Sequence, residues 1–147
     1  MTLEQIIKDL DLNVITEKKD FSGITPTHGY VSDMLSCVMT GAKNKSIWVT
    51  LQAHNNIVAV ACLLDIAAVI ISEGAKPDED TIKKANEEGI TLLSTDKNSF
   101  SVVGRLWQLG LRDQERANPW PAHKKTSSYI EQNFIFTQFC PPARLWK

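Results

Sequence analysis

Polar side chains suited to ligand binding gather in one short stretch, Gln52–Asn56 (QAHNN). It follows an apolar, β-branched run (IWVTL) and leads directly into a second apolar segment, with no glycine or proline between them. An N-cap from Asn55 or Asn56 would account for one of these side chains and is worth about 1 kcal/mol. Gln52, His54 and the other asparagine remain, and they suggest a pocket for a small molecule or anion. A solvated loop without special meaning and a contact between subunits are the alternatives.

The motifs that mark common active sites do not occur in this sequence. The segment GAKNKS lacks one glycine of a P-loop and has the wrong spacing, and neither G-x-G-x-x-G nor G-x-S-x-G nor H-E-x-x-H is present. The three histidines are far apart, with no Cys or Glu at ligand spacing, so we expect neither a metal nor a cofactor. Cys37, Cys62 and Cys140 are odd in number and widely spaced, which indicates free thiols in a reducing compartment. We therefore predict that the chain is not itself an enzyme.

Composition and charge exclude several classes of protein. With 147 residues, 43% hydrophobic and 22% charged, the chain is typical of one soluble globular domain. A formal net charge of -1 argues against a nucleic-acid binder or a partner of anionic membranes. The N-terminus lacks the pattern of a signal peptide, and the longest apolar run, Ile57–Ile71, is broken by Asp65 and too short to span a membrane. The expected location is the cytoplasm.

Periodicity predicts strands and helices that alternate along the chain. A capping box, Thr2 with Gln5, opens a short first helix. The polar residues 17–29 are expected to form a loop, followed by a helix that includes Val31, with Ser32 or Asp33 near its start as cap or first-turn acid. Further helices are expected over Asn56–Leu64, from Pro77 to a C-cap at Gly89, and over residues 99–109 after a cap at Asp96, Asn98 or Ser99. The expected strands are Leu12–Thr16, Ile47–Leu51, Ala67–Ser72 and Ile90–Thr95.

Connections of this length predict crossovers, and hence an α/β fold with a mainly parallel sheet of about four strands and helices on both faces. In such sheets ligands bind outside the carboxyl ends of the strands, where helix N-termini present free N–H groups. Four segments are expected there: the loop Gly29–Asp33, the stretch Gln52–Asn56, Ser72–Gly74 and Thr95–Asn98. The predicted binding residues are Gly29, Asp33, Thr50, Gln52, His54, Asn55, Asn56 and Thr95.

The end of the chain has a different composition. From Ala117 onward it contains four of the six prolines, two tryptophans, three phenylalanines and a single acid, Glu131. We expect two parts: an α/β domain over residues 1–111 and a tail over residues 112–147. A tail rich in aromatic residues is expected to pack on the domain or on a neighbouring subunit, and a disordered or non-native extension is the alternative.

Three stretches carry a family resemblance: HGYVSDMLSCVM, the run from Ile47 to Thr95, and SFSVVGRLWQL. They resemble the DRTGG domain in its small, free-standing bacterial form, over about Leu3–Leu111. The resemblance implies a three-layer α/β/α sandwich similar to the N-terminal domain of HPr serine kinase/phosphorylase. It also implies an accessory or regulatory role, since the domain accompanies CBS pairs in larger proteins. The pentad DRTGG itself is absent, and THG at Thr27–Gly29 falls where that pentad would end.

The kinase activity of the related protein belongs to a separate P-loop domain, which this sequence lacks, so it is not implied here. The sequence predicts a non-catalytic regulatory or ligand-binding module whose ligand is a small molecule, nucleotide or other anion. We expect a homo-oligomer or a protein partner, because the apolar strands and the aromatic tail must be buried against other parts of the protein or another chain. The alternative function is an accessory subunit of a phosphotransfer enzyme completed by a partner chain.

Overall fold

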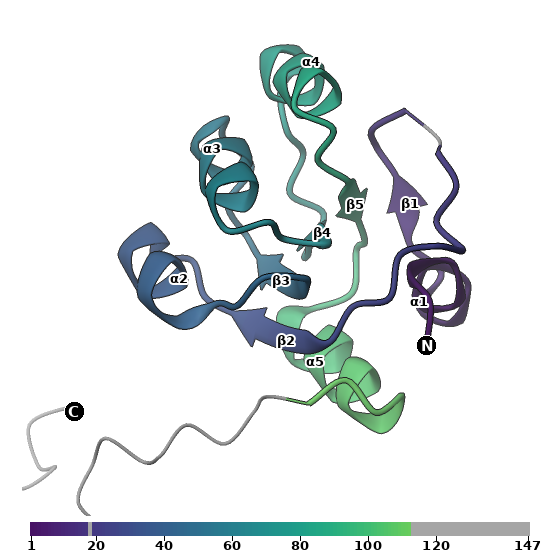
Figure 1. The fold of residues 1–147 in the computed structure, drawn as a ribbon. Helices are drawn as coiled ribbons and strands as arrows, with labels where there is room; N and C mark the ends of the chain where they lie inside the picture. Colours follow the sequence, from purple (N-terminus) through teal and green to yellow (C-terminus); the bar gives the residue numbers. More distant parts are fainter. Residues whose placement is uncertain (18, 113–147) are drawn as a thin grey trace, which may run out of the picture. The chain divides into compact units, whose positions relative to one another are not determined.

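One sheet flanked by helices makes up the part of the chain that the structure, a computed structural model, describes: residues 1–17 and 19–112. The strands are β1 (Asn13–Val14), β2 (His28–Val31), β3 (Ser46–Thr50), β4 (Ala68–Ile71) and β5 (Leu92–Ser94). The helices are α1 (Leu3–Leu10), α2 (Leu35–Gly41), α3 (Asn56–Leu63), α4 (Glu79–Glu87) and α5 (Ser99–Gln108) (Figure 1). The predicted tail lies outside the described residues, apart from Arg112.

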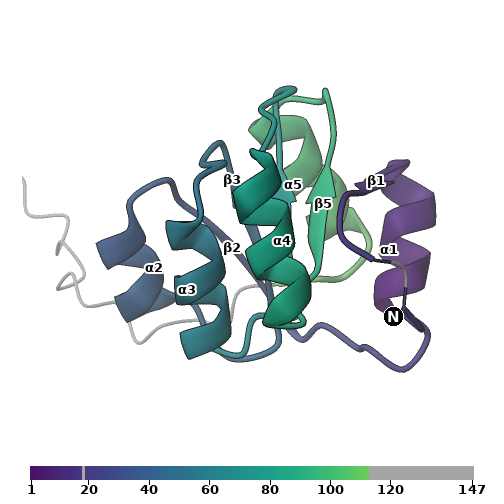
Figure 2. The ribbon, with the colours of Figure 1, turned by 90° about the horizontal axis from the view of Figure 1, so that it is seen from above.

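The strand order is β1-β5-β4-β3-β2, in which β2 to β5 run parallel and β1 pairs antiparallel with β5. Three consecutive crossovers, through α2, α3 and α4, step in the same direction across the sheet. Because parallel crossovers share one hand, these three helices lie side by side on one face (Figure 2). Helices α1 and α5 cover the other face (Figure 1). The predicted mainly parallel α/β/α sandwich is confirmed, with five described strands where about four were expected.

Strands β3 and β4 are buried along their whole length. Their side chains alternate between the two layers: Ile47 and Ile70 join the core with α1 and α5, while Trp48 and Val69 join the core with α2, α3 and α4. This two-sided burial explains why both strands read as nearly continuous apolar runs instead of alternating ones.

Strand β2 is absent from the sequence-based prediction, which treated these residues as a loop and as the start of a helix. His28–Val31 instead pairs with β3 in register, from His28 opposite Ser46 to Val31 opposite Val49. Val31 has helical spacing relative to α2, but it belongs to the strand because its backbone pairs with a segment 18 residues away. The predicted caps Ser32 and Asp33 are also wrong, since α2 starts after Met34, which makes no side-chain cap bond.

Side-chain caps define the ends of several helices. The predicted capping box of α1 is present, with Thr2 and Gln5 bonded to each other's backbone N–H groups. Asp78 accepts the Thr81 N–H at the start of α4, and Asn98 accepts the Ser101 N–H at 2.8 Å at the start of α5. Asn55 occupies the predicted N-cap position of α3, but its side chain does not make the predicted capping hydrogen bond.

Loss of the α5 cap should destabilise the domain, because α5 packs against β2 and β3. We expect Asn98→Ala to lower the free energy of unfolding by about 1 kcal/mol. For a domain of this size, that corresponds to a melting temperature lower by about 5 °C in thermal denaturation followed by circular dichroism. Asn98→Ser keeps a capping oxygen and should lose much less. An Asn98→Ala protein as stable as the unmodified chain would contradict this role of the cap.

Candidate functional site

The carboxyl ends of β2 and β3 are tied together by one carboxylate. Asp33, which follows β2, accepts a hydrogen bond from the Thr50 hydroxyl at 2.8 Å and one from the Leu51 N–H at 2.7 Å, both through Oδ1. The Gln52 N–H donates in turn to the Thr50 Oγ1 at 3.1 Å. Thr50 is fully buried and Asp33 is exposed, so the carboxylate closes the edge of the sheet from the solvent side. The chain leaving β3 is therefore held in one conformation by an acidic side chain.

A second carboxylate occupies the N-terminus of α5. Glu73, which follows β4, accepts the Ser99 N–H at 3.2 Å and the Ser99 hydroxyl at 3.1 Å through Oε1. Glu73 has a positive φ of 60°, followed by Gly74 at 72°, and this left-handed turn precedes α4. The buried Ser72 lies 2.8 Å from Ser99 through their hydroxyl oxygens, which joins the ends of β4 and α5. The protein thus fills this anion-binding position with its own side chain.

The polar stretch Gln52–Asn56 leads into α3, and its side chains are largely open to solvent. His54, Asn55 and Asn56 are exposed, and Gln52 is half-buried. The first turn of α3 is closed by backbone bonds from Ile57 and Val58 to the carbonyls of His54 and Asn55. The start of α3 lies at the edge of the sheet where the carboxyl ends of the parallel strands meet, called the carboxyl edge, and Asn55 provides no side-chain cap there.

His54 also lies near the start of α4. Hydrogen bonding from Thr81 is the main cause that lowers the pKa of the Asp78 carboxyl, and the electrostatic interaction with His54 adds to it in the same direction. The stretch Gln52–Asn56 therefore borders the N-termini of both α3 and α4.

The predicted binding residues do not form one pocket. Asp33, Thr50 and Gln52 are joined by hydrogen bonds. Thr95 is buried at the end of β5, where its Oγ1 accepts the Lys97 N–H. Gly29 lies within β2 and not in a loop, and a Cβ there would be 3.5 Å from Leu111.

Glu73 lies in the predicted edge segment Ser72–Gly74 and Ser99 is one of the possible helix caps predicted, but the sequence did not predict the contact between them. The sequence offered one signal for Glu73, an acidic residue beside a glycine soon after a buried strand. It could not reveal the hydrogen-bond partner, because Ser99 is 26 residues away.

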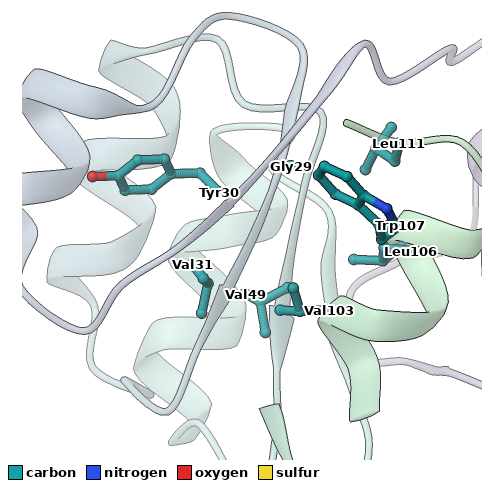
Figure 3. A pocket seen from close by; sticks show the side chains of 8 residues that line it. All are labelled: Gly29, Tyr30, Val31, Val49, Val103, Leu106, Trp107 and Leu111. Atoms are coloured by element: carbon teal, nitrogen blue, oxygen red, sulfur yellow. The ribbon is translucent and has the colours of Figure 1, made fainter. Parts of the chain in front are cut away.

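An apolar cavity of about 260 Å³ lies between α5 and the end of the sheet (Figure 3). Side chains of β2, β3 and α5 surround it, whereas the Tyr30 ring points away from it. Its lining residues are Gly29, Tyr30, Val31, Val49, Val103, Leu106, Trp107 and Leu111. The sequence did not predict this cavity, because its walls come from three segments and from the strand that periodicity missed.

Within residues 1–17 and 19–112, no three His, Cys, Asp or Glu side chains come together in a way that could hold a metal ion. None of the helices in the same ranges has the length and apolar character to cross a bilayer. Cys37 and Cys62 are free thiols, as predicted, and Cys140 lies outside the described residues.

Comparison with known proteins assigns the fold to a family. The DRTGG domain model matches residues 5–109, which is most of the chain. The chain belongs to the DRTGG domain family. This confirms the resemblance seen in the sequence, although the pentad that names the family is absent. A search of curated proteins found no match.

A solved structure with a similar fold contains the same kind of domain. It is the crystal structure of the CBS and DRTGG domains of the regulatory region of Clostridium perfringens pyrophosphatase, complexed with its activator, diadenosine tetraphosphate. The TM-score is 0.54 at 21% sequence identity, and the match covers 70% of this chain and 44% of that one. The chain thus spans less than half the length of this structure, and at this identity the likeness is one of fold.

Removing the Asp33 carboxylate should destabilise this DRTGG domain. Asp33→Ala leaves the buried Thr50 hydroxyl and the Leu51 N–H without their acceptor, and we expect a loss of about 1–2 kcal/mol in urea denaturation. Asp33→Asn keeps one oxygen acceptor and should lose less. Equal stability of the Ala variant and the unmodified chain would show that the carboxylate does not hold the edge.

Proposed function

We propose that this DRTGG domain is a non-catalytic regulatory module that binds a small anionic ligand at the start of α3. The ligand class is a nucleotide or another phosphorylated metabolite. The binding groups are the exposed side chains of His54, Asn55 and Asn56 together with Gln52, and N–H groups of the first turn of α3 add their dipoles.

The observation that carries this proposal is a difference between the helix starts of the described chain. Thr2, Asp78 and Asn98 cap α1, α4 and α5 with side-chain hydrogen bonds, whereas the N-cap of α2, Met34, makes none. The side chain of Asn55 makes no such bond at α3. No carboxylate side chain accepts from the first-turn N–H groups of Ile57 and Val58 at α3, whereas an anion at α5 would compete with Glu73.

Family membership supports the regulatory half of the proposal. A structure of similar fold comes from the regulatory region of a pyrophosphatase and was obtained with a dinucleotide activator. A regulatory domain needs a ligand or partner but no reacting groups. The P-loop domain on which the activity of the related kinase depends has no counterpart in this sequence.

Ligand binding can be tested with the full chain by thermal shift and isothermal titration calorimetry. The probes are ATP, AMP, diadenosine tetraphosphate and inorganic phosphate. A ligand at 100 times its Kd should stabilise the folded state by about 2.7 kcal/mol. We expect at least one nucleotide to raise the melting temperature, and the double variant Gln52→Ala/His54→Ala to weaken its binding by about 10-fold or more, equivalent to about 1.4 kcal/mol.

Asn44→Ala is the matched control, because Asn44 is exposed in the turn before β3, at the opposite edge of the sheet. It should bind the same nucleotide with unchanged affinity. If no probe stabilises the protein, the ligand proposal is wrong. If the double variant binds as well as the unmodified chain, the site lies elsewhere. Release or transfer of phosphate by the purified chain alone would contradict the non-catalytic assignment.

A further inference from the structure

Exposed apolar side chains gather where α5 meets the end strand β2. Phe100 is 88% exposed, Trp107 is 50% exposed and Val31 is 51% exposed. Phe100, Val103 and Trp107 follow the i, i+3, i+7 spacing of one helical face. Val103 and Trp107 line the apolar cavity together with Val31, so this face of α5 is directed toward the end of the sheet (Figure 3). Val31, Phe100, Val103 and Trp107 are called the β2–α5 surface below.

The backbone edge beside this surface is also open. β2 is the last strand in the order β1-β5-β4-β3-β2, so its outer side has no strand partner among the described residues. Natural proteins protect such edges with charged side chains, with proline or by keeping the strand very short. The opposite end of the sheet follows that rule, since β1 has two residues, whereas β2 has four and carries no Asp, Glu, Lys or Arg.

Charged residues are rare throughout this part of the molecule. Residues 28–41, which form β2 and α2, contain only Asp33, and α5 contains only Arg105. Two charges in these 24 residues compare with 22% charged residues in the whole chain. Depletion of charge together with exposed aromatic residues is the composition of an interface core and not of a solvated surface.

We propose that the β2–α5 surface is the contact between two copies of this chain, related by a two-fold axis. The two β2 edges would lie antiparallel, and Phe100 of each copy would cover the cavity of the other. A two-fold contact requires one patch that complements itself, and here the exposed ring and the cavity lie on the same surface. A cavity of about 260 Å³ has room for a phenyl ring, because an engineered cavity of about 150 Å³ holds benzene.

The size and charge of the surface favour a second copy over a charged partner. From the usual area of aromatic side chains, Phe100 and Trp107 expose on the order of 250 Å² together. A stable interface buries about 800 Å² per partner, and the strand edge with Val31 and Met34, which is 64% exposed, adds to this area. Val31, Phe100, Val103 and Trp107 carry no charge of their own, and the Arg112 guanidinium carbon lies 4.5 Å from the centroid of the Trp107 ring. Two copies of these four uncharged side chains present no like charges of their own to each other.

Analytical ultracentrifugation and size-exclusion chromatography with light scattering test this contact on the full chain at concentrations from 1 to 200 µM. The informative variant is Phe100→Lys, since Phe100 is so exposed that its replacement should leave folding intact. The matched control is Leu63→Lys on α3, where the leucine is 69% exposed and lies outside the β2–α5 surface. Val31→Lys places a charge on the edge strand itself.

We expect a dimer whose Kd rises at least 100-fold in Phe100→Lys and in Val31→Lys, with Leu63→Lys unchanged. Circular dichroism should give similar melting temperatures for Phe100→Lys and Leu63→Lys at concentrations where both are monomeric. A monomer at 200 µM for the unmodified chain would overturn the proposal. Equal weakening of the dimer by Leu63→Lys and Phe100→Lys would overturn it as well. Ligand binding at α3 is measured independently of either result.

Discussion

Burial of β3 and β4 on both faces is the constraint on which the rest of the structure depends. Each central strand has apolar side chains in both directions, and Trp48 alone requires a large covered volume on the side of α2, α3 and α4. Consecutive crossovers in one direction can cover only one face of a sheet. The opposite face must therefore be covered by elements outside the crossovers, and α1 and α5 do so from the two ends of the described chain. The path of α5 across β2 and β3 follows from this need.

The same parallel arrangement brings polar residues to one edge, and much of that polarity is satisfied within the protein. Asp33 joins β2 to β3, and Glu73 joins β4 to the start of α5. These carboxylates satisfy N–H groups that a ligand would otherwise use. The polar residues at the carboxyl edge are thus partly structural, and α3 is the helix start at which external binding has least competition.

Two surfaces with different physics result from this fold. The carboxyl edge is polar, whereas the β2–α5 surface is made of apolar side chains, with the Arg112 guanidinium over its Trp107 ring. They share β2, because Asp33 follows the last residue of the strand and Val31 is that residue.

Periodicity and caps in the sequence determined most of the local structure. The capping box at Thr2, the end of α4 near Gly89 and the apolar runs of β3 and β4 were readable because each depends on residues close together in the chain. The C-cap itself is Glu88, and Gly89 follows it in the left-handed conformation with a φ of 68°. The sequence also determined the α/β class and the position of the carboxyl edge, since a helix between successive strands makes a parallel crossover.

Tertiary structure alone decided β2, the role of Asp33 and the apolar cavity. In each case the deciding contacts join distant segments: His28–Val31 with β3, Asp33 with Thr50, and β2 and β3 with α5 around the cavity. A short segment such as His28–Val31 has no periodicity that distinguishes strand from loop, and its backbone pairing is what makes it a strand. The sequence could identify which residues carry hydrogen-bonding groups, but the fold decided which of those groups satisfy each other and which remain exposed for a ligand.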